Sequence, residues 1–280
     1  MSVPLVRAAA VAEAARRLTA AGVPSARHDA EVLAALSLGI ERGELWRCDT
    51  VGPAFEVLVA RRAAREPLQH ITGRAYFRHV ALAVGPGVFV PRPETELVAE
   101  AAISEARTVA GSHPPVVVDL CTGSGAIIAS VLDEVAGVRA YAVELDRAAH
   151  AWAERNLAGS GVDLRLGDMA AALADLDGQV DVVVSNPPYI PLGAHIRDPE
   201  VAAHDPALAL WSGADGLDAL RVVAAAAARL LRPGGLLVVE HADVQGEAAP
   251  AVLAATPGLT DAADHQDLAG RDRYATARRR

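Results

Sequence analysis

The sequence contains no lysine, because all 26 of its basic residues are arginine. This absence excludes Schiff-base chemistry, a lysine general base and the lysine of a phosphate-binding P-loop. The two cysteines, Cys48 and Cys121, are too few for a disulfide framework or a four-thiolate zinc site. Aromatic residues make up 4% of the 280 residues, so the core must consist mainly of Val, Leu and Ala.

Long apolar runs are also missing. No segment reaches the roughly 18 uncharged apolar residues of a membrane-spanning helix. Charged residues at Arg7, Glu13, Arg16 and Arg17 interrupt the N-terminal stretch in which a signal peptide would lie. We therefore expect a cytoplasmic protein that does not bind a membrane.

The net charge of −9 is distributed unevenly. Residues 1–72 carry 9 arginines and 8 acidic residues, residues 73–115 carry 4 of each, and residues 116–280 carry 13 and 23. Nucleic-acid binding requires clustered positive charge. The acidic C-terminal region therefore argues against direct nucleic-acid binding.

The same three regions differ in hydrophobic pattern and predict three domains. Residues 1–72 favour helices beginning at Leu5, Ser25 and Phe55, which predicts an N-terminal helical domain. It contains no catalytic pattern, so it serves either packing or the docking of a protein substrate. Residues 73–115 predict a linker.

In that linker, the pattern predicts a strand over 76–84, a turn at Gly85-Pro86-Gly87, a second strand over 88–90 and a connecting helix that runs from about Pro91 to Val109. From residue 116, buried apolar strands alternate with helices, and a β pair closes the chain. This alternation predicts an α/β fold with a doubly wound, mostly parallel sheet.

A glycine-rich segment, Asp119-Leu-Cys121-Thr122-Gly123-Ser124-Gly125-Ala126, follows the first of these strands. Small residues let a ligand approach the backbone, and the following helix N-terminus offers free N–H groups. Ile128 occupies the third glycine position of the NAD fingerprint, so that fingerprint fails. By itself, the segment fits a tight turn as well as a ligand loop.

Two further carboxylates end the next strands. Glu144 follows the glycines by about 20 residues, a position from which an acid can accept hydrogen bonds from both ribose hydroxyls. Asp168, beside Met169, can accept one from an adenine amino group. Each acid alone fits a helix cap or a solvated side chain, but acids at three successive strand ends indicate an adenosine site.

The strand over 180–185 runs directly into Asn186-Pro187-Pro188-Tyr189. The prolines restrict the backbone and remove two N–H donors. What remains is a rim of acceptors, the Asn186 side-chain oxygen and the Pro187 carbonyl, which suits a planar NH₂ group, and Tyr189 can stack on its plane. A rigid turn is the alternative interpretation.

These residues suggest a mechanism. An amide nitrogen is a poor nucleophile because its lone pair is delocalised. Accepting both of its N–H bonds away from the resting geometry favours a pyramidal nitrogen whose lone pair faces the sulfonium methyl of S-adenosylmethionine. No strong base or metal is required, since the proton can leave after transfer, and the nine histidines show no catalytic spacing.

The chain resembles, over nearly its whole length, the release-factor glutamine methyltransferase family of the class I S-adenosylmethionine-dependent fold. The resemblance rests on Pro67 to Gly73 with Phe89 to Glu96, on Asp119 to Ala126, on Asn186 to Tyr189 and on Asp267 to Tyr274. It implies a seven-stranded sheet, an N-terminal domain that helps hold the protein substrate, and a β-hairpin linker. It also implies methylation of the glutamine in the Gly-Gly-Gln motif of peptide chain release factors, with S-adenosylhomocysteine as product.

The resemblance also implies roles for individual residues. The cofactor-binding set is Asp119, Cys121, Thr122, Gly123, Ser124, Gly125, Glu144, Asp168, Met169 and Asn186. The expected glutamine-binding residues are Asn186, Pro187, Pro188 and Tyr189. Of these, Asn186, Pro187 and Tyr189 are the expected catalytic residues. Phe89 forms either an apolar wall beside the target amide or ordinary linker packing.

Three positions depart from the family pattern. Cys121 stands where glycine is usual, Glu144 where aspartate is usual and Met169 where an aromatic residue is common. Each is expected to affect cofactor affinity, but none removes a required group.

Alternative functions remain open at this point. The chain can be a glutamine methyltransferase that acts on a ribosomal protein, an adenine amino-methyltransferase that acts on nucleic acid, or a non-enzymatic adaptor that binds adenosine compounds. The sequence does not determine the oligomeric state. Residues 190–212 lack a clear period, and we hypothesise that they form a mobile flap over the substrate amide.

Overall fold

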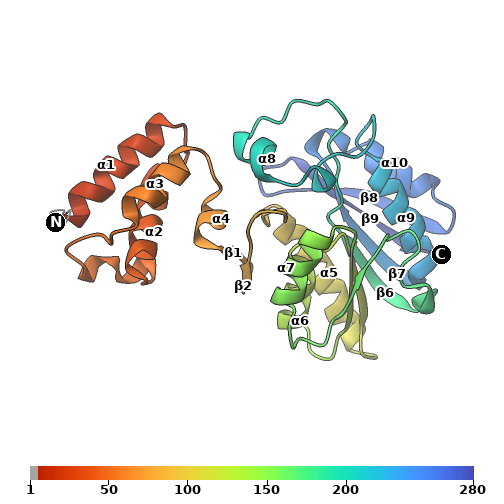
Figure 1. Ribbon diagram of the computed structural model, residues 1–280. Helices are drawn as coiled ribbons and strands as arrows, with labels where there is room; N and C mark the ends of the chain where they lie inside the picture. Colours follow the sequence, from red (N-terminus) through yellow and green to blue (C-terminus); the bar gives the residue numbers. More distant parts are fainter. Residues whose placement is uncertain (1–5) are drawn as a thin grey trace. The chain divides into compact units, whose positions relative to one another are not determined.

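The computed structural model describes residues 6–280 and divides the chain into two compact units (Figure 1). The first unit comprises the chain up to Arg74 together with Ile196–His204, and the second comprises Ala75–His195 and Asp205–Arg280. The chain therefore leaves the second unit after His195, contributes nine residues to the first, and returns at Asp205. No helix within residues 6–280 is long and apolar enough to cross a membrane.

The first unit is helical. Its elements are α1 (Arg7–Ala20), α2 (Ala26–Leu38), the 3₁₀ helix η1 (Arg42–Arg47), α3 (Phe55–Ala63), α4 (Leu68–Thr72) and α8 (Pro199–His204). Gly39 ends α2 in the left-handed conformation that glycine favours, at φ 69°. The buried faces of α1, α2 and α3 meet in one core that contains Leu18, Leu33 and Phe55. The three predicted helices are confirmed, although Leu5 lies outside the described residues.

The second unit contains a seven-stranded sheet in the order β5-β4-β3-β6-β7-β9-β8. Its strands are β3 (Val116–Leu120), β4 (Arg139–Glu144), β5 (Asp163–Leu166), β6 (Val180–Ser185), β7 (Leu231–Glu240), β8 (Leu259–Gln266) and β9 (Asp272–Arg279). The first five are parallel, and β9 pairs antiparallel with both β7 and β8. The predicted doubly wound sheet and its closing β pair are confirmed.

Helices cover both faces of this sheet (Figure 1). One face packs against α5 (Thr95–Ala110), α6 (Ala126–Glu134) and α7 (Arg147–Asn156), and the other against α9 (Asp218–Leu230) and α10 (Ala248–Ala255). Alternate residues of β3 point into the two cores: Val117 faces the first, whereas Val118 and Leu120 face the second. A sheet buried on both faces explains why its strands are continuously apolar.

The linker departs from the prediction. Instead of one strand over 76–84 and another over 88–90, a short hairpin forms from β1 (Arg74–Phe77) and β2 (Val80–Ala83). Its turn lies at Arg78 and His79, where Arg78 takes φ 50°. Ion pairs from Arg78 to Glu100 (2.6 Å) and Glu134 (2.5 Å) support this turn. The sequence has no glycine at these two positions, so no local signal predicts the turn.

Candidate active site

The carboxyl ends of β3, β4, β5 and β6 lie at one edge of the sheet, because these strands are parallel and paired in register. The segments that follow them hold nearly all the predicted site residues. Parallel α/β sheets bind ligands outside this edge. The register therefore places the predicted cofactor and acceptor residues on the same side of the molecule.

The glycine-rich loop is held by a side chain at the end of the neighbouring strand β4. Glu144 Oε2 accepts a hydrogen bond from the Gly123 N–H at 2.8 Å, and its Oε1 accepts one from Asp146 N–H at 2.9 Å. Gly123 (φ 58°) and Gly125 (φ 84°) both adopt left-handed backbone conformations. A Cβ on Gly125 would lie 3.1 Å from Leu157, so close packing also requires glycine there.

Cys121 also has a positive φ, 60°, which explains why glycine is the usual residue at this position of the family pattern. Its Sγ lies 3.5 Å from Met169 Sδ, so two of the departures from the pattern contact each other. Burial, and secondarily the negative charge of Glu144, raise the pKa of the Cys121 thiol. The thiol is therefore uncharged at neutral pH and is not an activated nucleophile.

Asp119 is fully buried at the end of β3. Its Oδ2 accepts a 2.6 Å hydrogen bond from the Thr122 hydroxyl, but Oδ1 has no hydrogen-bond partner among the described residues. Burial raises the pKa of Asp119 to about 7. An ammonium donor would satisfy the free oxygen and favour the ionised form. This acceptor therefore fits the ammonium group in the amino-acid part of S-adenosylmethionine.

The remaining adenosine-side residues lie next to these. The Gly167 N–H donates to the Glu144 carbonyl at 2.9 Å, which joins the ends of β5 and β4. Asp168 Oδ1 accepts from the Ala170 N–H at 2.9 Å, and Ser124 is buried. No group of three or more His, Cys, Asp or Glu side chains within residues 6–280 is arranged to hold a metal ion.

Asn186 follows β6 and is oriented by a residue from another element. Its Nδ2 donates to the hydroxyl of Thr95, the buried first residue of α5, at 3.1 Å. An amide carbon carries one nitrogen and one oxygen, so this bond turns the Asn186 oxygen away from Thr95. Pro187 is buried and Pro188 half-buried. The side-chain oxygen is thus available as an acceptor, as the sequence interpretation requires.

Tyr189 is held by a second residue that the sequence reasoning missed. Its hydroxyl lies 3.4 Å from Oε1 of Glu240, the last residue of β7, and Gln245 Nε2 donates to its carbonyl at 3.1 Å. Two features of the sequence could have indicated these residues. Thr95 belongs to the linker motif Phe89 to Glu96, and Glu240 ends an apolar strand, as Glu144 does.

Phe89 lies outside the strands, and its ring contacts the Arg92 guanidinium at 5.0 Å from the ring centroid. Its place beside the acceptor amide stays a prediction. In the segment 190–212, the Ile190 N–H donates to the Leu210 carbonyl and the Ser212 N–H donates to the Ile190 carbonyl, so the two ends of the segment are joined. Whether the part between them moves also stays a prediction.

Comparison with known proteins agrees with this arrangement. Residues 9–73 match the PrmC N-terminal domain, and residues 102–198 match the methyltransferase small domain. Among solved structures, a 16S rRNA N2 G1207 methyltransferase of T. thermophilus, in complex with AdoMet and guanosine, superposes with a TM-score of 0.51 at 21% identity. The match covers 74% of this chain and 50% of that chain. This likeness supports the class I methyltransferase fold.

Three curated relatives are similar over most of the chain. The release factor glutamine methyltransferase of Streptomyces coelicolor is 57% identical, covering 97% of both chains, and that of Mycolicibacterium smegmatis is 47% identical, covering 96% of both. The 4-amino-L-phenylalanine/4-methylamino-L-phenylalanine methyltransferase of Streptomyces pristinaespiralis is 44% identical, covering 89% of this chain and 87% of its own. On this similarity, the chain belongs to the release factor glutamine methyltransferase family.

Proposed function

We propose that the protein methylates the side-chain amide nitrogen of the glutamine in the Gly-Gly-Gln motif of peptide chain release factors, with S-adenosylmethionine as methyl donor. The observation that carries the proposal is the 57% identity, over 97% of both chains, to a protein named for this activity. The orientation of Asn186 by Thr95 supports it, because it leaves an oxygen acceptor beside the two prolines. We place the activity in the cytoplasm.

The proposed roles follow the geometry. The loop from Asp119 to Gly125, with Glu144, Asp168 and Met169, holds the cofactor, which when bound supplies an electrophilic methyl group on a sulfonium. Asn186 Oδ1 and the Pro187 carbonyl accept the two N–H bonds of the acceptor amide and favour a pyramidal nitrogen. Tyr189 stacks on the plane of the amide, and Phe89 closes its apolar side. The surplus amide proton leaves to solvent after transfer.

A second candidate methyl acceptor must be compared in the same assay. The Streptomyces pristinaespiralis relative is named for a substrate whose amino group lies on an aromatic ring. That nitrogen, like an amide nitrogen, is planar and has a delocalised lone pair, so an Asn-Pro-Pro-Tyr rim suits both. The fold and the rim therefore define the chemistry of the acceptor, and the substrate must be distinguished by assay.

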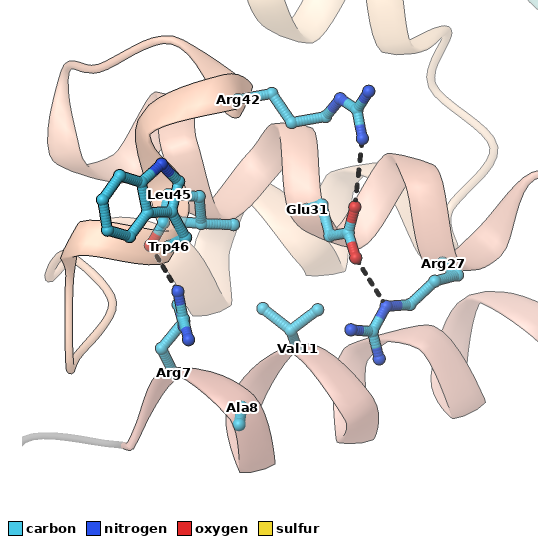
Figure 2. A pocket seen from close by; sticks show the side chains of 8 residues that line it. All are labelled: Arg7, Ala8, Val11, Arg27, Glu31, Arg42, Leu45 and Trp46. Atoms are coloured by element: carbon cyan, nitrogen blue, oxygen red, sulfur yellow. Dashed lines mark hydrogen bonds and ion pairs between the residues drawn. The ribbon is translucent and has the colours of Figure 1, made fainter.

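We propose that the first unit docks the release factor. It contains a pocket of about 270 Å³ between α1, α2 and η1 (Figure 2). Val11 and Leu45 form its apolar floor, and Trp46, 71% exposed, stands at its edge.

The charged side chains that line the pocket have a net charge of +2. They are Arg7, Arg27 and Arg42, with Glu31 as the acidic residue. Glu31 pairs with Arg27 at 2.7 Å and with Arg42 at 3.2 Å. Figure 2 shows its carboxylate between the two guanidinium groups. A cationic rim around an apolar floor fits an acidic segment of the partner that also presents an apolar side chain.

The deciding experiment supplies S-adenosylmethionine and one of two release factors, either unchanged or with its Gly-Gly-Gln glutamine replaced by alanine. Mass spectrometry should show one added methyl on the first and none on the second. Asn186→Ala should abolish transfer while S-adenosylhomocysteine binding, measured by calorimetry, persists. Parallel reactions contain 4-amino-L-phenylalanine, a ribosomal protein extract or an adenine-containing nucleic acid. Methylation of any of these, with the release factor unmodified, would overturn the proposal.

A further inference from the structure

Glu240 is a buried carboxylate that the mechanism above does not use. It ends β7 at the same sheet edge as Asn186, because β6 and β7 are parallel neighbours with Ser185 opposite Val239. It is 1% exposed. A buried carboxylate is costly unless hydrogen bonds compensate for lost hydration, and Oε2 of Glu240 has no hydrogen-bond partner among the described residues.

Glu240 and Thr95 contact the two ends of the Asn-Pro-Pro-Tyr motif. The Tyr189 hydroxyl donates to Glu240 Oε1 at 3.4 Å. Thr95 Oγ1 in turn accepts from Asn186 Nδ2 at 3.1 Å. An ionised carboxylate can only accept a hydrogen bond, so Glu240 fixes the Tyr189 hydroxyl as the donor of this contact.

We propose that Thr95 and Glu240 are positioning residues for methyl transfer, which hold the Asn186 amide with its oxygen toward the acceptor nitrogen and fix Tyr189 beside it. This inference rests on the proposed function. Without the Thr95 hydroxyl, the Asn186 NH₂ group loses the acceptor that holds it. The amide can then reverse and present its NH₂ group to the NH₂ group of the acceptor, so that two donors face each other.

The network also makes turnover depend on pH. Burial raises the pKa of Glu240 to about 7, while the nearby hydroxyls of Thr95 and Tyr189 and the positive charge of Arg273 lower it and the charge of Glu94 raises it. The ionised form is the stronger acceptor for the Tyr189 hydroxyl, so kcat should rise as the pH increases through about 7. In Glu240→Gln, kcat should be low and this rise should disappear.

The test compares isosteric substitutions. Thr95→Val keeps the shape and removes the hydroxyl, and should lower kcat about tenfold to a hundredfold, as expected for one lost hydrogen bond in a transition state. Thr95→Ser restores the hydroxyl and should recover most of the turnover. Thr108→Val, the same change at an exposed position of α5, is the matched control and should not alter kcat. The Kd for S-adenosylhomocysteine should be the same in the wild type and all three variants.

The outcomes separate this inference from the proposed function. If the wild-type protein methylates the release factor and Thr95→Val does so equally fast, the inference is wrong and the function stands. Equal loss in Thr95→Val and Thr95→Ser would also overturn it, because packing rather than the hydroxyl would then matter. If the wild-type protein modifies only 4-amino-L-phenylalanine, the proposed function fails and the same variants test the network with that acceptor. If the wild-type protein modifies neither acceptor, both the proposed function and this inference are wrong.

Discussion

Arg62 Nη1 lies 2.7 Å from Glu200 Oε1, although 138 residues separate them in the sequence. Arg62 also donates to Asp29 at 2.7 Å, and both side chains are almost fully buried. Arg65 approaches the same Glu200 oxygen at 2.8 Å. One buried arginine thus ties α8 into the core of the first unit, and α8 comes from the segment that follows the Asn-Pro-Pro-Tyr motif.

We therefore expect Arg62→Met to lower the free energy of unfolding by about 3 kcal/mol, because it leaves the buried Asp29 carboxylate without its positively charged partner. The matched control is Arg61→Met, since Arg61 is exposed and pairs with Glu66. Its effect should be below about 1 kcal/mol. Denaturant unfolding measures both, and hydrogen exchange should increase over 196–204 in Arg62→Met alone. Equal stability of the two variants would contradict this account.

Cys121 should tolerate glycine and reject β-branched residues, because of its φ of 60°. Cys121→Gly relieves the left-handed strain but increases the entropy of the unfolded chain, so stability should stay within about 1 kcal/mol of wild type. Cys121→Val should lose about 2 kcal/mol and weaken cofactor binding. Thermal unfolding and calorimetry with S-adenosylhomocysteine measure these effects. A Cys121→Val protein as stable as the glycine variant would show that the loop is not strained.

Glu240 should reduce stability at high pH while it supports turnover. Burial raises its pKa from 4.5 to about 7, so the folded state retains a proton that the unfolded state has lost between these pH values. Stability therefore falls as the pH rises from about 4.5 to about 7, by roughly 3 kcal/mol for this group. Asp119 contributes in the same direction. Glu240→Gln should then be more stable than wild type at about pH 8 but not at about pH 4.5.

Unfolding titrations at the two pH values test this prediction. Glu240→Asn serves as the control that also shortens the side chain. Lower stability of Glu240→Gln at both pH values would mean that the ionised carboxylate stabilises the fold, and the proposed division between stability and turnover would be wrong.

The pocket of the first unit should affect substrate affinity alone. Trp46→Ala and Arg27→Glu should each raise the KM for an intact release factor about tenfold or more, because they remove an apolar contact and reverse a charge at the rim. Neither change should alter kcat, nor the methylation of a short Gly-Gly-Gln peptide that cannot reach this pocket. Initial rates at two salt concentrations measure the effect, which should weaken at high salt for Arg27→Glu.

Arg16→Glu provides the matched control, since Arg16 is exposed on α1, has an acid one turn away as Arg27 does, and does not line the pocket. It should leave the KM unchanged. An equal rise in KM for Arg16→Glu would attribute the effect to overall charge, and no rise in any variant would exclude the pocket as the docking surface.

The sequence by itself determined the features that depend on neighbouring residues. Continuous apolar strands such as 180–185 fold into a doubly buried sheet wherever helices alternate with them, and glycines after a strand permit the left-handed turns seen at Gly123 and Gly125. The polar residues that end those strands can therefore be assigned to one edge of the sheet from the chain's pattern alone.

Only the tertiary structure decided which side chains meet across that edge. Thr95 and Glu240 lie in separate elements, and their pairing with Asn186 and Tyr189 depends on strand order and helix packing. The turn at Arg78 depends likewise on ion pairs with distant helices, and α8 joins the first unit through Arg62. Such contacts have no local pattern, because a hydrogen bond between residues far apart in the chain exists only once the intervening chain has folded.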